Sequence, residues 1–252
     1  MTVLEQLLPG LWTWTADHPD WGKPETSWDA AVRGYLAFAD DATLLVDPLL
    51  EPPEHPEGAQ GRSELGALVH KRGRPVAIFV TIPWHLRSAE ELVGRFDATA
   101  YSHRKLGPRL AKAGKWRELV PGKRYPGGVA AHPIGNPRTR ETPLFLPSHH
   151  ALVVGDTIVE ARGTGAPRLW ASVDPKPGSR VWYEKRYVPS FRPLLALPVE
   201  HLLLTHGRPV VGRGHEALRE AIFCLSTIAT EGRGRAGKPR RGAPRARDAG
   251  QQ

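Results

Sequence analysis

The chain has 252 residues, of which 40% are hydrophobic and 24% are charged, as in ordinary globular domains. A single cysteine, Cys224, excludes an intrachain disulfide, and no apolar stretch approaches the roughly 20 residues of a membrane-spanning helix. The N-terminus lacks the basic and apolar pattern of a secretion signal. Together these features predict a cytoplasmic protein with no membrane association.

The formal net charge of +9 is concentrated in the C-terminal tail. Residues 231–252 contain seven basic and two acidic side chains, a net charge of +5, and they lack apolar periodicity. This composition predicts a disordered basic tail after a single domain over residues 1–230. Two roles stay open for the tail: a solvated extension without a specific function, or an anchor for nucleic acid or another polyanion.

The first third of the domain has the pattern of a strand meander. Residues 11–15 follow a turn and predict a strand. Residues 34–39 and 42–47 are rich in strand-forming side chains and predict a hairpin that turns at the acidic pair 40–41.

After residue 62 the predicted helices and strands alternate. Helices are predicted over 63–71, 88–96, 106–113, 193–197 and 215–226. Ser63 is the expected N-cap of the first helix, and Ser88 begins a capping box at the start of the second. Strands are predicted over 75–81, 98–101, 129–133, 142–146, 151–158 and 199–205. A meander followed by alternating elements favours an α/β (α+β) fold in which a mixed sheet packs against helices.

Three of the apolar strands lead into side chains that can bind a metal ion. The strand over 75–81 leads to His85, the run LVVGD ends at Asp156, and the run LLLTH ends at His206. Strand ends are rigid positions from which side chains can converge. Because imidazole and carboxylate ligands together suit zinc, and also iron or manganese, these three residues predict a divalent-metal site.

The order of these segments resembles the metallo-β-lactamase-like metallo-hydrolase superfamily. The resemblance rests on Asp47 after TLLV, on TIPWHLRS after PVAIFV, and on the VVGDT and LLTHG segments. It implies a four-layer αββα sandwich and a metal-dependent hydrolase. It further implies that Asp156 matches the family's bridging Asp, that His206 matches the final His, and that Asp47 supports the site from behind the ligands.

The family's main metal motif, THxHxDH, is degenerate in this chain. With a one-residue shift after Thr81, His85 matches the second His and Arg87 stands in place of the Asp; without the shift, not even His85 matches. Arg138 falls at the position of the next family ligand, and an arginine cannot ligate a metal at ordinary pH. Glu141, close by, is a candidate replacement ligand, and His103 after the strand over 98–101 is a further candidate for the cleft.

These observations leave three functional hypotheses. The first is a hydrolase of a small ester-, thioester- or lactone-like substrate that uses zinc or another divalent metal. The second is a catalytically inactive protein of the same fold, without a metal, that binds an anionic small molecule through Arg87 and Arg138. The third is a polyanion-binding protein, with nucleic acid bound only by the tail.

Overall fold

The computed structural model describes residues 4–19, 30–135, 140–160, 165–170 and 180–223. Arg138, Cys224 and the predicted tail over 231–252 lie outside the described residues. No helix in the described part of the chain is long and apolar enough to span a membrane.

Within the described residues, the first sheet has seven strands in chain order. The N-terminal four are antiparallel, and the predicted strand and hairpin are confirmed by β2 and by β3 with β4. From β4 onward the strands are parallel. The strands are β1 (Glu5–Leu8), β2 (Leu11–Asp17), β3 (Ala31–Phe38), β4 (Thr43–Val46), β5 (Val76–Phe79), β6 (Thr99–Ser102) and β7 (Lys115–Glu118).

Parallel neighbours in this sheet need crossover connections, and three helices supply them. They are α1 (Pro56–Arg72), α2 (Ala89–Phe96) and α3 (Gly107–Ala113), which follows the 3-10 turn η1 (Arg104–Leu106). The predicted start of the first helix at Ser63 is wrong. The helix begins at Pro56, whose fixed φ suits a first helical position. Ser88 does precede α2, but its hydroxyl accepts a hydrogen bond from the Leu50 N–H at 2.9 Å and does not cap the helix.

The second sheet has the order β13-β10-β9-β8, in which β10 and β13 are parallel. Its strands are β8 (Ala130–Ala131), β9 (Leu144–Leu146), β10 (Ala151–Val154) and β13 (His201–Leu204). The prediction of one strand over 151–158 is wrong, because the chain turns at 155–157 and resumes as β11 (Ile158–Glu160), paired with β12 (Pro167–Leu169). The remaining elements are η2 (Pro126–Gly128), η3 (Pro147–His149), α4 (Arg180–Trp182), η5 (Tyr183–Tyr187), η6 (Val188–Ala196) and α5 (Gly214–Phe223).

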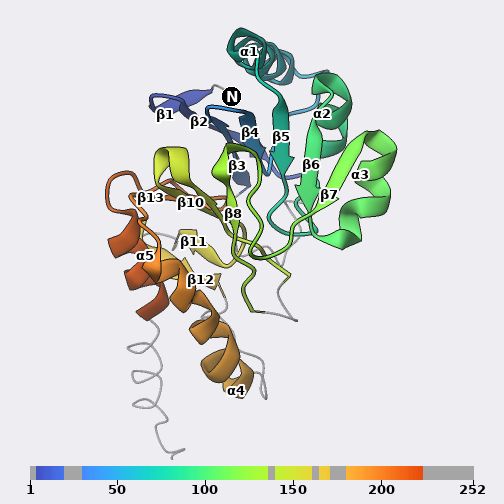
Figure 1. The fold of residues 1–252 in the computed structure, drawn as a ribbon. Helices are drawn as coiled ribbons and strands as arrows, with labels where there is room; N and C mark the ends of the chain where they lie inside the picture. The colour runs from blue at the N-terminus through green and yellow to red at the C-terminus, as the bar shows by residue number, and fades with distance from the viewer. Residues whose placement is uncertain (1–3, 20–29, 136–139, 161–164, 171–179, 224–252) are drawn as a thin grey trace, which may run out of the picture.

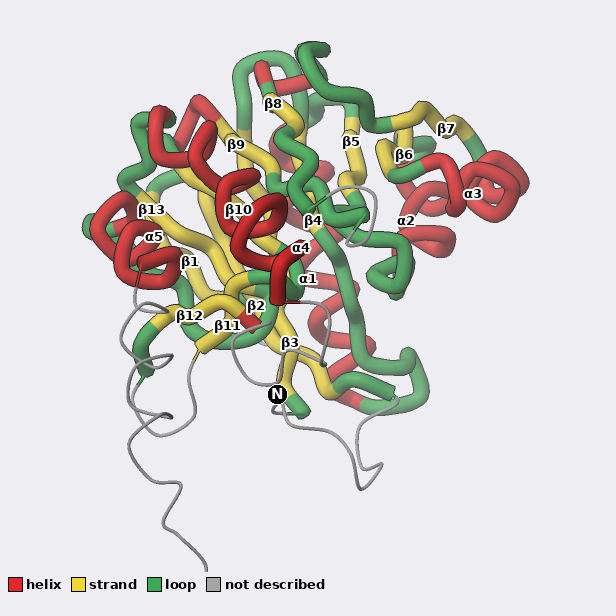
Figure 2. The backbone as a smooth tube through the Cα atoms, turned by 90° about the horizontal axis from the view of Figure 1, so that it is seen from below, coloured by secondary structure: helices red, strands yellow, loops and turns green. Residues whose placement is uncertain are grey.

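Three apolar cores separate four layers. Alternating strand residues divide between them: Leu44 faces the core between the two sheets, whereas Leu45 faces the core beneath α1 and α2. In the second sheet, Val153 faces the inter-sheet core and Val154 faces the core under η6 and α5. Figures 1 and 2 show the resulting arrangement, with α1–α3 on one side of the paired sheets and α5 on the other. The predicted αββα sandwich is therefore confirmed.

Candidate metal centre

Three side chains from two sheets meet at one edge of the sandwich. His85 lies in the loop after β5, Asp156 lies two residues after the end of β10, and His206 lies two residues after the end of β13. Asp156 Oδ1 lies 2.8 Å from His85 Nε2 and 3.0 Å from His206 Nε2. One ligand atom from each residue lies within 4.8 Å of the other two, so the structure brings together the three residues predicted as metal ligands.

His85 lies between two carboxylates. Its Nδ1 is 3.0 Å from Asp47 Oδ2, and its Nε2 is 2.8 Å from Asp156 Oδ1. The imidazole is buried, at 2% exposure. A neutral imidazole carries only one N–H, so it can donate to only one of these carboxylates. A second positive centre, either a proton or a metal ion, is needed on the other side of the ring.

Asp47 holds the His85 ring from the side opposite Asp156. Its Oδ1 accepts the Thr81 backbone N–H at 2.8 Å, and its Oδ2 accepts the Thr81 hydroxyl as well as facing His85. Asp47 is fully buried and has φ +45°, an unusual conformation for a residue with a side chain. This arrangement favours a proton on His85 Nδ1 and directs the Nε2 lone pair toward Asp156 and His206.

Glu141 organises the loop that presents Asp156. Its Oε1 accepts hydrogen bonds from the Gly155 N–H at 2.9 Å and the Thr157 hydroxyl at 2.6 Å. Its Oε2 accepts the backbone N–H groups of Asp156 at 3.0 Å and Thr157 at 2.9 Å. A Cβ at Gly155 would approach Thr81 Oγ1 to 2.8 Å, so this close packing requires glycine. Both Glu141 oxygens serve the loop, and Glu141 does not join the group of three.

Burial and neighbouring charges shift every ionisable group of this network. Burial, reinforced by the Asp156 charge, raises the pKa of Glu141 to about 7. Burial alone would raise the pKa of Asp156, but the two imidazoles hold it well below the usual range. Burial and Arg87 oppose a charge on His85, yet the Asp156 and Asp47 carboxylates outweigh them and raise its pKa. Burial lowers the pKa of His206, so His206 is the more neutral of the two imidazoles.

Trp84 is a site residue that the sequence reasoning did not single out. Its indole N–H donates to Asp156 Oδ2, the oxygen that does not face the imidazoles. Although Trp84 lies beside buried residues, it is 56% exposed. This contact fixes the rotation of the Asp156 carboxylate and leaves a large aromatic surface at the mouth of the site. The available signal was its position directly before His85.

The backbone after β13 is tied to β10 and β11. The Thr205 hydroxyl donates to the Val154 carbonyl at 2.8 Å, and the Glu160 N–H donates to the His206 carbonyl at 2.9 Å. Gly207 has φ +132°, and a Cβ there would lie 2.3 Å from the Glu160 Cβ. Only glycine fits this turn, which fixes the direction in which the chain presents His206.

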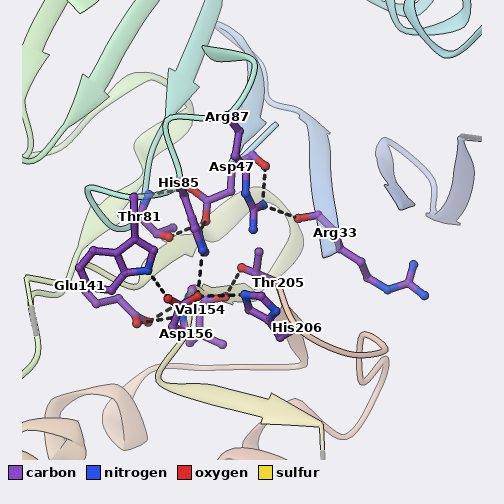
Figure 3. A network of polar contacts seen from close by, with 12 residues as sticks. Arg33, Asp47, Thr81, His85, Arg87, Glu141, Val154, Asp156, Thr205 and His206 are labelled. Carbon is purple, nitrogen blue, oxygen red and sulfur yellow. Dashed lines mark hydrogen bonds and ion pairs between the residues drawn. The ribbon is translucent and has the colours of Figure 1, made fainter. Parts of the chain in front are cut away.

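Arg87 places a permanent cation beside the imidazoles. Its Nη1 donates to the carbonyls of Asp47 at 2.9 Å and Arg33 at 3.1 Å, whereas Nε and Nη2 are buried without a hydrogen-bond partner in the described part of the chain. Burial lowers the pKa of Arg87, but the Asp47 and Asp156 charges oppose that shift. Figure 3 shows the guanidinium beside the His85 ring, on the side where Thr205 and His206 lie.

The other predicted site residues do not join this group. His103 Nδ1 accepts the Lys105 backbone N–H at 3.2 Å and caps η1. Arg138 lies outside the described residues. The group of three His and Asp ligand atoms therefore remains the candidate centre, with Asp47, Thr81, Trp84 and Glu141 supporting it.

The three residues fit a single divalent ion. Asp156 Oδ1 is buried, and two imidazole nitrogens lie within 3.0 Å of it. In a tetrahedral site with bonds of about 2.0–2.2 Å, ligand atoms are roughly 3.4 Å apart. A small outward movement of the side chains would therefore accommodate zinc, and the donor set of two imidazoles and a carboxylate is one that zinc accepts.

Comparison with solved structures identifies the fold. The metallo-β-lactamase DIM-1 aligns with a TM-score of 0.59 at 11% identity, covering 90% of this chain and 98% of its own. An enzyme from Erythrobacter litoralis, with beta mercaptoethanol in its active site, aligns with a TM-score of 0.58 at 16% identity, covering 89% and 96%. FIM-1 from Pseudomonas aeruginosa, in its mono-zinc form, aligns with a TM-score of 0.57 at 14% identity, covering 90% and 96%.

Comparisons of the sequence alone find no relative. No protein-family model matches it, and no curated protein matches it significantly. The architecture and the structural matches nevertheless agree over about nine tenths of the chain. The chain therefore has the metallo-β-lactamase fold, as the order of its sequence segments predicted.

Proposed function

We propose that this protein is a metal-dependent hydrolase that cleaves a small ester-, thioester- or lactone-like substrate at the centre formed by His85, Asp156 and His206. The observation that carries the proposal is the position of His85 between two carboxylates, 3.0 Å from Asp47 and 2.8 Å from Asp156. Its Nε2 and the His206 Nε2 converge on one buried carboxylate oxygen, Asp156 Oδ1. A divalent cation on this side of the ring would balance the charges.

His85, Asp156 and His206 would hold the ion, and open coordination positions would remain for substrate and water. When bound, such an ion supplies Lewis acidity and a nucleophile formed from water. Asp47 keeps the His85 ring oriented through Nδ1, and Thr81 in turn holds Asp47. Trp84 restrains Asp156 so that one carboxylate oxygen faces the imidazoles.

Zinc is the proposed metal, with iron and manganese as alternatives for the same donor set. Support comes from the composition of the cluster and from the mono-zinc form of FIM-1, whose fold this chain shares. Esters, thioesters and lactones are proposed as substrates because their hydrolysis needs only a polarised carbonyl group and an activated water.

Metal analysis of the full chain, combined with a hydrolysis assay, tests the proposal. The protein would be stripped with a chelator, reloaded with zinc, manganese or iron(II), and analysed by mass spectrometry. It would then be assayed on a neutral 4-nitrophenyl ester, a thioester and a lactone. We expect about one equivalent of metal and metal-dependent hydrolysis. His206→Ala should lose both properties, whereas His150→Ala, which removes an exposed imidazole paired with Glu200, should retain them.

Two results would overturn the proposal. Wild-type protein that retains no stoichiometric metal after reloading would leave His85 as a protonated imidazolium, in keeping with a catalytically inactive protein. Metal binding that survives His206→Ala unchanged would place the ion at other residues.

A further inference from the structure

Arg87 has a guanidinium whose hydrogen-bonding capacity is only partly used. Nη1 donates to two backbone carbonyls, which fixes the orientation of the group. Nε and Nη2 are buried, and neither has a hydrogen-bond partner among the described residues. Among the described arginines, Arg72 and Arg168 each have one such nitrogen, whereas Arg87 has two. A charged group with two buried, unserved donors is costly, so a partner for it is expected.

The two unserved nitrogens form one edge of the guanidinium plane. Their N–H groups point in parallel, at the spacing of the two oxygens of a carboxylate or of a phosphate. A single acceptor atom, such as a water oxygen or a chloride ion, can meet both donors only through bent hydrogen bonds. The shape of the vacant edge therefore selects an anion that has two acceptor oxygens.

The nearby carboxylates of the described residues are engaged elsewhere. Asp47 accepts hydrogen bonds from Thr81 and lies beside His85. Asp156 accepts a hydrogen bond from Trp84 and lies beside both imidazoles. Glu141 has both oxygens bound to the 155–157 loop. None of the three accepts a hydrogen bond from the Nε–Nη2 edge of Arg87. The partner of this edge is therefore expected to come from a ligand.

The vacant edge lies at the candidate metal centre. Arg87 follows His85 by two residues, and its charge acts on both His85 and His206. Its φ of +45° is unusual for a residue with a side chain, and such strain is concentrated at functional sites. Figure 3 shows the guanidinium extending past Asp47 toward the side of Thr205 and His206.

We propose that the Nε–Nη2 edge of Arg87 binds a carboxylate or phosphate group of the substrate, so that the protein prefers small anionic substrates. This inference rests on the proposed function, because the anionic group would belong to a molecule processed at the same centre. Arg87 as a whole is only partly buried, but the two nitrogens are covered.

A nuclear magnetic resonance titration tests anion binding at Arg87 directly. Full-length wild-type protein, with and without zinc, would be titrated with acetate, inorganic phosphate and chloride at equal ionic strength. The Nε–H resonance of Arg87 would be assigned from its loss in Arg87→Lys. We expect a saturable shift with acetate or phosphate and none with chloride, while the Nε–H of Arg72 stays unchanged. No saturable shift, or an equal shift with chloride, overturns the inference.

A pair of ester substrates gives a second test. The preference of the zinc-loaded enzyme is the ratio of kcat/KM for the 4-nitrophenyl half-ester of succinic acid to that for neutral 4-nitrophenyl acetate. Arg87→Lys keeps the charge but loses the paired N–H donors of the guanidinium. It should reduce this ratio about 10- to 100-fold, mainly by raising KM for the charged half-ester. Arg72→Lys should not change it. An unchanged ratio in Arg87→Lys would mean that Arg87 only supports the loop.

The two proposals can fail separately. If zinc binds and the neutral ester is hydrolysed but no anion shifts the Arg87 resonance, the anion inference fails and the hydrolase proposal stands. If anions shift the resonance but no metal binds, the hydrolase proposal fails and anion recognition at Arg87 remains.

Discussion

The two sheets build their halves of the metal centre by different means. At the end of β5, His85 is held by side-chain charges: Asp47 faces its Nδ1, and Arg87 lies beside it. Both Asp47 and Arg87 have φ of +45°. At the end of β10, Asp156 is held through its backbone, because Glu141 accepts hydrogen bonds from the N–H groups of residues 155–157.

The supports in the first half therefore control the protonation of a metal ligand, whereas those in the second half control the position of one. In the first half, a change at Asp47 alters the proton on His85 and the strength of that imidazole as a ligand. In the second half, a change at Glu141 releases a loop and therefore costs folding energy first and ligand geometry second. Variants in the two halves should consequently differ in whether stability or metal affinity suffers more.

Substitution of a ligand should have the largest effect. Asp156→Asn keeps the size of the side chain but removes the charge on which both imidazoles converge. We expect zinc affinity to fall by more than about 100-fold, which is a larger loss than the one expected for a residue that only supports a ligand. Competition with a chromophoric chelator would measure it. Asp97→Asn, in an exposed pair with Lys115, is the matched control. Equal zinc affinity in the two variants would exclude Asp156 as a ligand.

Glu141→Ala should mainly reduce stability. The change removes the carboxyl group and leaves the backbone N–H groups of residues 155–157 without the acceptor that Glu141 provides. We expect the unfolding free energy of the metal-free protein to fall by about 2 kcal/mol or more at pH 6, measured by urea titration. Glu64→Ala on α1, which removes a surface contact with Gln60, should cost little. A similar, small loss in both variants would contradict the role assigned to Glu141.

The pH dependence of stability should identify Glu141 as well. Its folded-state pKa of about 7 lies above the ordinary value of 4.5, so the folded chain retains a proton that the unfolded chain releases. The corresponding stabilisation is present below about pH 4.5 and is lost as the pH rises through about 7. The stability of wild type relative to Glu141→Gln, whose side chain does not titrate, should fall by about 3 kcal/mol across this range. A constant difference between the two proteins would show that folding does not raise the pKa of Glu141.

Asp47→Asn should weaken metal binding more than folding. The change removes the charge behind His85 and leaves the size of the side chain intact. Supporting carboxylates of this kind contribute about 10- to 100-fold to metal affinity. Chelator competition would again be the measurement, with Asp41→Asn at an exposed turn as the control. Wild-type affinity in Asp47→Asn would mean that His85 needs no carboxylate on Nδ1.

Trp84→Phe should have the smallest effect. The ring remains, but the N–H that restrains Asp156 Oδ2 is lost. We expect zinc affinity to fall by less than about 10-fold. Trp116→Phe removes an indole hydrogen bond to Ser102 elsewhere in the chain and should leave zinc affinity unchanged. If the two variants behave alike, the contact of Trp84 with Asp156 has no role in metal binding.

The sequence predicted the parts of this structure that depend on continuous apolar strands. The runs that became β5, β10 and β13 are buried along their whole length, so their ends could be located and the residues after them proposed as ligands. By contrast, β7 was missed because it is a mostly exposed edge strand, and its residues Lys115–Glu118 lack an apolar face. The start of α1 was missed because its first turns pack few apolar side chains.

The supporting contacts could not be predicted for a different reason. Glu141 accepts hydrogen bonds from backbone N–H groups at 155–157. A contact with the backbone leaves no pattern of side chains in the sequence from which it could be predicted. Trp84 acts through a single indole N–H to a residue of the other sheet. Both depend on how the two sheets meet, which is fixed by the packing of the inter-sheet core. The candidate ligands and Asp47 behind them were predicted, while the contacts of Thr81, Trp84 and Glu141 that hold them required the structure.

X-ray absorption at the zinc edge of the reloaded wild-type protein tests the central claim most directly. If the ends of β5, β10 and β13 hold one ion, the spectrum should contain two imidazole nitrogens and carboxylate oxygen at about 2.0–2.2 Å from zinc. The imidazole contribution should fall by half in His206→Ala. A zinc shell without imidazole, or a wild-type protein that retains no zinc to measure, would contradict the account.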